Sequence, residues 1–169
     1  MRTVVVYNPL SGSGRSEAIA AAVERSLGRR GFEVELHPTQ GPGDATAIAR
    51  RFADAADLIV AVGGDGTINE VVNGMGAGVG GVGGASLDTG CRATLGIVPA
   101  GTVNVLALEL GIPFQVERAC EVIAEGKTRP LDLGIANGRR FTLMVGAGVD
   151  ALTVRNIDLR AKKRFKELA

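Results

Sequence analysis

The sequence predicts an α/β fold, a parallel-sheet βα domain followed by the start of a β-rich second domain. Two observations lead to this fold class. Short apolar runs of strand length alternate with segments whose apolar residues recur at helical spacing, and that order is typical of βα units. Beyond residue 130 two apolar segments flank the turn dipeptide Asn137-Gly138, which indicates an antiparallel hairpin.

The first two βα units occupy the start of the chain. Residues 2–7 are rich in β-branched side chains, as in a buried parallel strand, and the next segment repeats apolar residues every four positions, at Ile19, Val23 and Leu27. Gly31 ends this helix. Residues 32–37 alternate apolar and polar side chains, which predicts a half-buried strand near a sheet edge. A second helix is expected from about Asp44.

The third unit carries the most informative part of the chain. An apolar strand, Leu58 to Val62, runs directly into Gly63-Gly64-Asp65-Gly66-Thr67 and then into a helix. Glycines let backbone N–H groups approach an anion, and the positive end of the helix favours negative charge there. Asp65 would repel a phosphate unless a divalent cation, a nearby base or a substrate proton accounts for it. The segment predicts chemistry on a phosphate, although a plain strand-to-helix turn would also use glycine.

The rest of the α/β region repeats this order less regularly. Residues 74–90 are rich in glycine and predict a mobile loop. Ordered structure is expected again from Leu95, and a helix is expected to begin at Asn104. Val116, Cys120 and Ile123 then indicate a further amphipathic helix.

The composition predicts a domain boundary at Gly126 to Pro130. It divides the chain into an α/β domain over 1–128 and an incomplete β-rich domain over 129–169. The expected hairpin pairs residues 131–136 with 140–145. Because a two-stranded ribbon is marginal alone, we expect the residues from about 131 onward to be poorly ordered or to be stabilised by another chain.

Composition excludes several classes of protein. With 19 basic and 18 acidic residues, a net charge of +1 and no Trp, nothing favours a nucleic-acid partner. Cys91 and Cys120 have neither metal-ligand nor CxxC spacing, so we expect core-filling thiols in a reducing cytosol. No apolar run approaches the roughly 18 residues of a membrane span, and a cytoplasmic protein is expected.

Three motifs occur in order along the chain: Asn8 to Gly14, Gly63 to Gly74, and Leu95 to Asn104. Together they resemble the diacylglycerol kinase catalytic family, which includes bacterial lipid kinases and the sphingosine and ceramide kinases. NAD kinases and phosphofructokinases share the shorter Gly-Gly-Asp-Gly core, but the continuation Asn-Glu-Val-Val-Asn-Gly is similar to the lipid-kinase branch. The resemblance covers residues 1 to about 150. It departs at Val105, where many members have Asp.

The resemblance implies a lipid kinase that uses ATP and Mg²⁺ to phosphorylate a diacylglycerol-like or sphingoid-like hydroxyl. Asp65 would be catalytic, either influencing Mg²⁺ or accepting the hydroxyl proton. Asp150 resembles a position near the lipid head group, although a helix N-cap explains it nearly as well. The metal ligands are unknown. The implied ATP-binding residues are Asn8, Ser11, Gly12, Gly14, Thr39, Gly63, Gly64, Asp65, Gly66, Thr67, Asn69, Glu70, Gly101 and Thr102.

Several residues keep alternative interpretations. The turn from Asn8 is not a Walker A loop, since it lacks Gly-Lys-Ser/Thr, and a capped turn would also explain it. Asn104 could orient its loop or cap the following helix. His37 is expected to face solvent on its strand rather than to act as a base. The basic tail, from Arg155 to Lys166, suits either a solvated helix or anionic lipid.

The family's chains run to about twice this length and add a β domain that completes the cleft. We therefore expect this chain to be a fragment of a longer enzyme, inactive alone, that meets its lipid transiently as a peripheral protein at the membrane surface. The alternative is a nucleotide-binding module without turnover. An NAD(P) oxidoreductase is disfavoured, because no Gly-x-Gly-x-x-Gly follows the first strand. An exposed sheet edge could promote association, so a homo-oligomer stays open.

Overall fold

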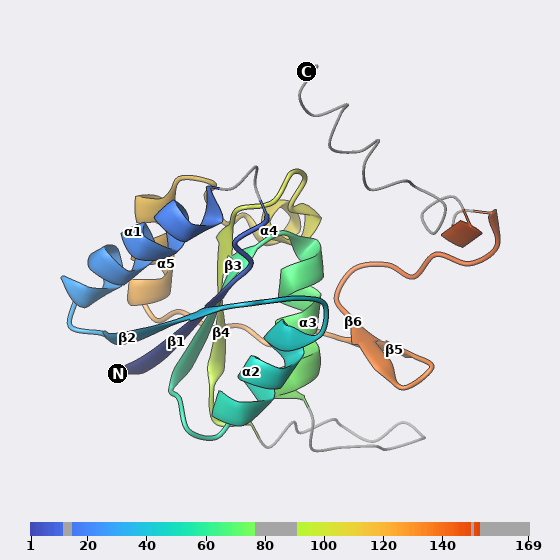
Figure 1. Ribbon diagram of the computed structural model, residues 1–169, viewed down its shortest axis with the longest axis horizontal. Coiled ribbons are helices and arrows are strands. Elements are labelled where there is room, and N and C mark those ends of the chain that lie inside the picture. The colour runs from blue at the N-terminus through green and yellow to red at the C-terminus, as the bar shows by residue number, and fades with distance from the viewer. Residues whose placement is uncertain (12–14, 77–90, 150, 153–169) are drawn as a thin grey trace.

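The computed structural model describes residues 1–11, 15–76, 91–149 and 151–152. Its centre is a parallel sheet of four strands in the order β2-β1-β3-β4, as Figure 1 shows. The expected position of the second strand at a sheet edge is thereby confirmed. The strands are β1 (Arg2–Tyr7), β2 (Glu33–Pro38), β3 (Leu58–Gly63) and β4 (Thr94–Pro99).

Helices cover both faces of the sheet (Figure 1). Side chains alternate along each strand, so β1 sends Val4 and Val6 to one face and Val5 and Tyr7 to the other. The first face packs against α2 (Asp44–Phe52), α3 (Asp65–Met75) and α4 (Val105–Leu110). The second packs against α1 (Ser16–Gly28) and α5 (Val116–Ala124). The predicted α/β class with a parallel sheet is confirmed.

The strand register brings the ends of the strands together. Tyr7 pairs with Pro38 on one side and with Val62 on the other, and Gly63 pairs with Pro99. Parallel strands end at the same edge, so the loops that follow all four strands meet there. We call this the carboxyl edge of the sheet.

The predicted hairpin is present, with shorter strands than expected. It consists of β5 (Gly134–Ala136) and β6 (Arg139–Phe141), which pair antiparallel. Asn137 and Gly138 have φ angles of 50° and 74°. Two successive positive φ values match a type I′ turn, whose twist suits a two-residue hairpin loop.

The hairpin is supported by α3 of the same chain, where we had expected disorder or another chain to be involved. The Asn73 Nδ2 group donates to the Arg140 carbonyl at 2.9 Å, and the Arg140 N–H donates to Asn73 Oδ1 at 2.9 Å. The side-chain amide therefore acts as a neighbouring strand would. Arg140 is only 8% exposed, and its guanidinium lies so close to Gly76 that a Cβ there would overlap it.

Other expectations concern the ends and the loops. The glycine-rich residues 77–90 and the basic tail beyond 152 lie outside the described residues. Cys91 and Cys120 are free thiols, and burial raises the pKa of both. Within the described ranges, no helix combines the length and apolarity needed to cross a bilayer.

Candidate functional site

The structure brings most of the predicted site residues to the carboxyl edge of the sheet. They lie in the loops after β1, β2, β3 and β4 and on the first turns of α3. Three of the predicted residues, Gly12, Gly14 and Asp150, lie outside the described part of the chain. Those that gather at this edge are Asn8, Ser11, Thr39, Gly63, Gly64, Asp65, Gly66, Thr67, Asn69, Glu70, Gly101 and Thr102.

The amino end of α3 is open to a ligand. Gly64 is the N-cap residue, in an extended conformation, and no side chain caps the helix. The first helical bond runs from the Ile68 N–H to the Gly64 carbonyl at 3.1 Å. The N–H groups of residues 65–67 donate to no group in the described ranges. Gly66 is exposed with open space beside it, so three amides and the positive helix end are available to an anion.

The loop after β4 touches this helix end. A Cβ on Gly101 would overlap the Cα of Gly64, so the two backbones are in direct contact. Asn104 closes the loop: its Oδ1 accepts the Gly101 N–H at 2.9 Å, and its Nδ2 donates to the Gly101 carbonyl at 3.0 Å. Asn104 is 2% exposed and has a φ of 55°. Of its two predicted roles, the structure shows loop orientation and not capping.

Asp65 caps α4 from outside that helix. Its Oδ2 accepts the Val105 N–H at 3.1 Å and its Oδ1 accepts the Leu106 N–H at 3.0 Å. Asn104, the N-cap residue of α4, makes no side-chain cap. Each Asp65 oxygen keeps a further lone pair for a ligand. The sequence did not predict this contact, because its partners are separated by 40 and 41 positions in the chain. The order of the two motifs was the only sequence feature that pointed to it.

Glu70 makes a similar contact with the loop before α2. Its Oε2 accepts the N–H of Gly43, the N-cap residue of α2, at 3.0 Å. Thr46 Oγ1 donates to the Glu70 carbonyl at 2.9 Å. The same loop begins at Thr39, whose N–H donates to the Tyr7 carbonyl at the end of β1 at 2.8 Å. Nothing in the motif pointed to Gly43 or Thr46.

The side chains of the loop after β1 form hydrogen bonds within the turn. Asn8 Oδ1 accepts the Leu10 N–H at 2.9 Å, and Ser11 Oγ donates to the Asn8 carbonyl at 3.0 Å. Ser16, the first residue of α1, also donates to the Ser11 carbonyl at 2.9 Å. These bonds match the capped turn that the sequence left open as an alternative.

His37 is the penultimate residue of β2, and its side chain packs against α2. Its Nε2 is 2.9 Å from Glu35 Oε1, and its ring centroid is 4.8 Å from that of Phe52. Only 19% of its side chain is exposed. The expectation that His37 faces solvent was therefore wrong, because the Phe52 ring of α2 covers it.

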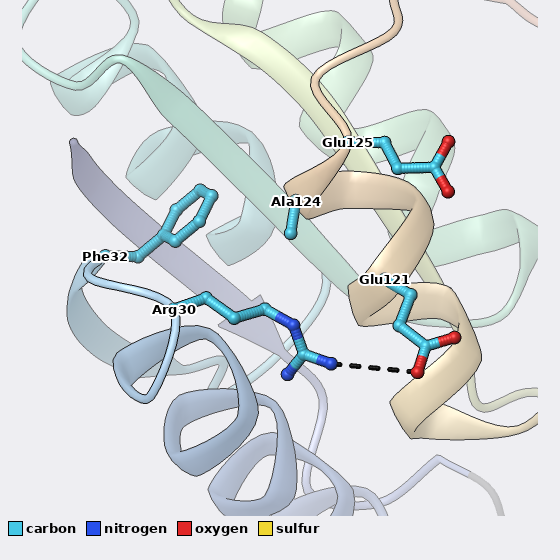
Figure 2. A pocket seen from close by; sticks show the side chains of 5 residues that line it. All are labelled: Arg30, Phe32, Glu121, Ala124 and Glu125. Carbon is cyan, nitrogen blue, oxygen red and sulfur yellow. Dashed lines mark ion pairs between the residues drawn. The ribbon is translucent and has the colours of Figure 1, made fainter.

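Two hollows open on the surface, and the second borders the residues of α4 that Asp65 contacts. One, of about 590 Å³, lies where α1 and α5 end and β2 begins, so it is at the edge opposite the motifs. Figure 2 shows it bordered by the ion pair of Arg30 with Glu121, 3.8 Å long. The other, of about 530 Å³, lies between α4 and the segments 129–132 and 142–144. Among the described side chains, no three His, Cys, Asp or Glu residues gather to hold a metal.

The comparisons with known proteins agree over most of the chain. A family model described as the diacylglycerol kinase catalytic domain matches residues 2–136. A diacylglycerol kinase of Bacillus subtilis is 40% identical over 163 residues, which are 95% of this chain and 50% of that protein. One of Staphylococcus epidermidis is 34% identical over 87% of this chain and 43% of its own length. The chain thus spans about half the length of these relatives.

A solved structure gives the same result for the fold. The crystal structure of a diacylglycerol kinase from Bacillus anthracis is 30% identical, with a TM-score of 0.69. The match covers 83% of this chain and 45% of that one.

Proposed function

The chain belongs to the diacylglycerol kinase catalytic domain family, and from that membership we propose that it is the nucleotide-binding part of a lipid kinase. In this proposal it binds ATP and takes part in transferring the γ-phosphoryl group to a lipid hydroxyl. The observation that carries the proposal is the uncapped end of α3, whose three free amides lie beside the Gly101 loop. Such a site suits phosphate by geometry and by charge.

Phosphoryl transfer depends mainly on positioning and on neutralising charge. In this proposal the amides of α3 hold the phosphates, and the hydroxyls of Thr39 and Thr102 contact the nucleotide from the loops after β2 and β4. Asn69 Oδ1 is buried and has no hydrogen-bond partner among the described groups. An unpaired acceptor costs about 1–3 kcal/mol, which a ligand hydroxyl could recover.

The Asp65 carboxylate is compatible with a Mg²⁺ ion that is held largely by the nucleotide. Mg²⁺ commonly binds one or two carboxylates together with substrate phosphates and water. Asp65 lies at the amino end of α3 and keeps a lone pair on each oxygen, so it can hold such an ion directly or through water. Bound Mg²⁺ would neutralise charge that develops on the phosphates. A carboxylate placed here could instead accept the hydroxyl proton of the substrate.

The lipid defines where the enzyme works. We propose a diacylglycerol-like or sphingoid-like acceptor, since the relatives are named diacylglycerol kinases. Such a lipid stays in the bilayer while ATP is dissolved, so the enzyme would act from the cytoplasm as a peripheral protein at the membrane surface. Asp150 remains the proposed head-group contact.

Calorimetric titration with MgATP tests the nucleotide part of the proposal. Thr39→Ala and Thr102→Ala should each weaken binding by about 2- to 10-fold, the value of one hydrogen bond. Thr94→Ala is the matched control, since Thr94 is exposed at the opposite end of β4. Unchanged affinity in both test variants would remove these two contacts from the site.

Transfer is tested separately with radiolabelled ATP and vesicles that contain diacylglycerol, sphingosine or ceramide. A labelled lipid supports the kinase proposal and identifies the acceptor. Binding of ATP without transfer to any lipid fits both the nucleotide-binding part of a kinase that is inactive alone and a nucleotide-binding module without turnover. Absence of both binding and transfer would contradict both functions.

A further inference from the structure

We propose that Asp65 and Glu70 are positioning residues: each carboxylate holds, through backbone amides, a neighbouring loop that carries a nucleotide contact. Asp65 would set the loop that carries Thr102, and Glu70 the loop that carries Thr39. The inference rests on the proposed function, because the two threonines are its nucleotide contacts. It assigns to the two acidic residues of the central motif a role that does not require them to touch the substrate.

The Asp65 contact fixes α4 relative to α3. Both carboxylate oxygens are used, one for the Val105 N–H at 3.1 Å and one for the Leu106 N–H at 3.0 Å. Two bonds to successive amides define the orientation of a short helix better than one bond could. α4 spans only six residues and has no side-chain cap of its own. Asp65 therefore supplies the cap that α4 lacks.

The contacts between the two loops form a closed ring. Gly64 touches Gly101, the Asn104 side chain holds both backbone groups of Gly101, and Val105 returns through its N–H to Asp65. The ring thus begins at Gly64 and ends at Asp65, which are adjacent in the chain. Thr102 lies in the chain between Gly101 and Asn104, so the closed ring restrains the backbone on both sides of it.

Glu70 holds the other loop in a comparable way. Its Oε2 accepts the Gly43 N–H at 3.0 Å, and Gly43 has a φ of 90° that disfavours other residues. Asp44 Oδ2 accepts the Gln40 N–H at 2.7 Å, which closes the turn next to Thr39. The first two turns of α3 therefore hold the loops on both sides of the helix.

A double-mutant cycle on nucleotide affinity separates positioning from the other roles of Asp65. We expect Asp65→Ala to weaken ATP binding about tenfold and to have little further effect once Thr102→Ala is present. Asp65→Asn keeps one acceptor and should show about a threefold loss. Fold-changes that multiply in the double variant, or equal losses in the Ala and Asn variants, would overturn the positioning role of Asp65.

The metal dependence gives a second discrimination. A positioning residue acts on the loop whether or not a cation is bound, so the loss in Asp65→Ala should persist when ATP is titrated in the presence of EDTA. A loss seen only with Mg²⁺ would instead make Asp65 a metal ligand and overturn the inference. Glu70→Gln combined with Thr39→Ala forms the corresponding cycle for the other loop.

Asp57→Asn is the matched control for these variants. The Asp57 carboxylate also accepts a backbone amide, the Arg2 N–H at 2.8 Å, but at the opposite edge of the sheet. Its substitution should leave ATP affinity unchanged. A similar loss of ATP affinity in Asp57→Asn would show that weakening any such carboxylate contact lowers affinity, because it destabilises the whole fold.

Amide hydrogen exchange makes the inference testable apart from function. The Val105 and Leu106 amides should exchange slowly in the parent and faster in Asp65→Ala, with Asp65→Asn between them. Unchanged exchange in Asp65→Ala would overturn the inference even if ATP binds. If the parent binds no ATP, the proposed function fails, while slow exchange that depends on Asp65 would still establish the cap. If Asp65→Ala does not fold, amide exchange in Asp65→Asn decides the inference instead.

Discussion

Single residues determine how closely the loops of the candidate site approach one another. Gly64 and Gly101 meet backbone to backbone, where a Cβ on either one would crowd the other loop. Asn104 adopts a left-handed conformation that few residues other than Gly, Asn and Asp tolerate, and its side chain satisfies both backbone groups of Gly101. The identity of these residues follows from contact and conformation, and not from turn formation alone.

Gly101→Ala is predicted to destabilise the protein. The added methyl group would overlap the Cα of Gly64 and lie 2.7 Å from Asn104 Oδ1, and backbone atoms cannot move aside cheaply. We expect a loss of about 1–3 kcal/mol in the free energy of unfolding, measured with urea. Gly66→Ala is the control, because a Cβ there meets nothing within 4 Å and alanine favours a helix. Equal stability of both variants would contradict the close contact.

At the scale of elements, two features hold the helices in place. On one face, α1 and α5 are joined by Glu117, which accepts a hydrogen bond from Ser26 and pairs with Arg29 at 3.0 Å. On the other, the Asn73 side chain joins α3 to β6. Each is a polar contact between elements that are far apart in the sequence, added to the apolar packing of the sheet.

The Glu117 contacts predict an acid-sensitive contribution to stability. The Ser26 hydrogen bond, followed by the charge of Arg29, holds the pKa of Glu117 below its ordinary value of 4.5. A lowered folded pKa gives stability that is complete above about pH 4.5 and is lost as the pH falls through the folded value. The stability difference between parent and Glu117→Gln should therefore shrink on acidification.

Urea unfolding at neutral and acidic pH measures this difference. Glu24→Gln serves as the control, since Glu24 is exposed on α1 and has no ion pair in the described part of the chain. Because Arg29 and Glu117 are exposed, the effect should also decrease with added salt. A difference between parent and Glu117→Gln that does not change with pH would refute the assignment.

Asn73→Ala is predicted to release the hairpin from α3. Both hydrogen bonds to the Arg140 backbone would be lost, and a two-stranded ribbon is marginal without support. Trypsin should then cleave after Arg139 and Arg140 faster than in the parent. Asn73→Asp keeps the acceptor for the Arg140 N–H and should show an intermediate rate. Equal cleavage rates in all three proteins would mean that Asn73 does not hold the hairpin.

At the scale of the whole molecule, the sequence predicted the sheet better than it predicted the contacts between distant segments. The βα alternation predicted the parallel sheet, and the polar alternation in residues 32–37 placed β2 at an edge. Both are local patterns. The Asp65 cap on α4, the Glu70 contact with Gly43 and the hairpin on α3 join distant segments. Local patterns carry no information about such pairings, so they became visible only in the fold.

The central claim is that a nucleotide binds at the carboxyl edge of the sheet, and NMR of the ¹⁵N-labelled chain titrated with MgATP tests it most directly. We predict that the largest amide shift changes occur in residues 63–67 and 101–102, where the uncapped end of α3 meets the Gly101 loop. Changes confined to the opposite edge, around the hollow bordered by Arg30 and Glu121, would contradict the account. So would an unchanged spectrum at saturating nucleotide.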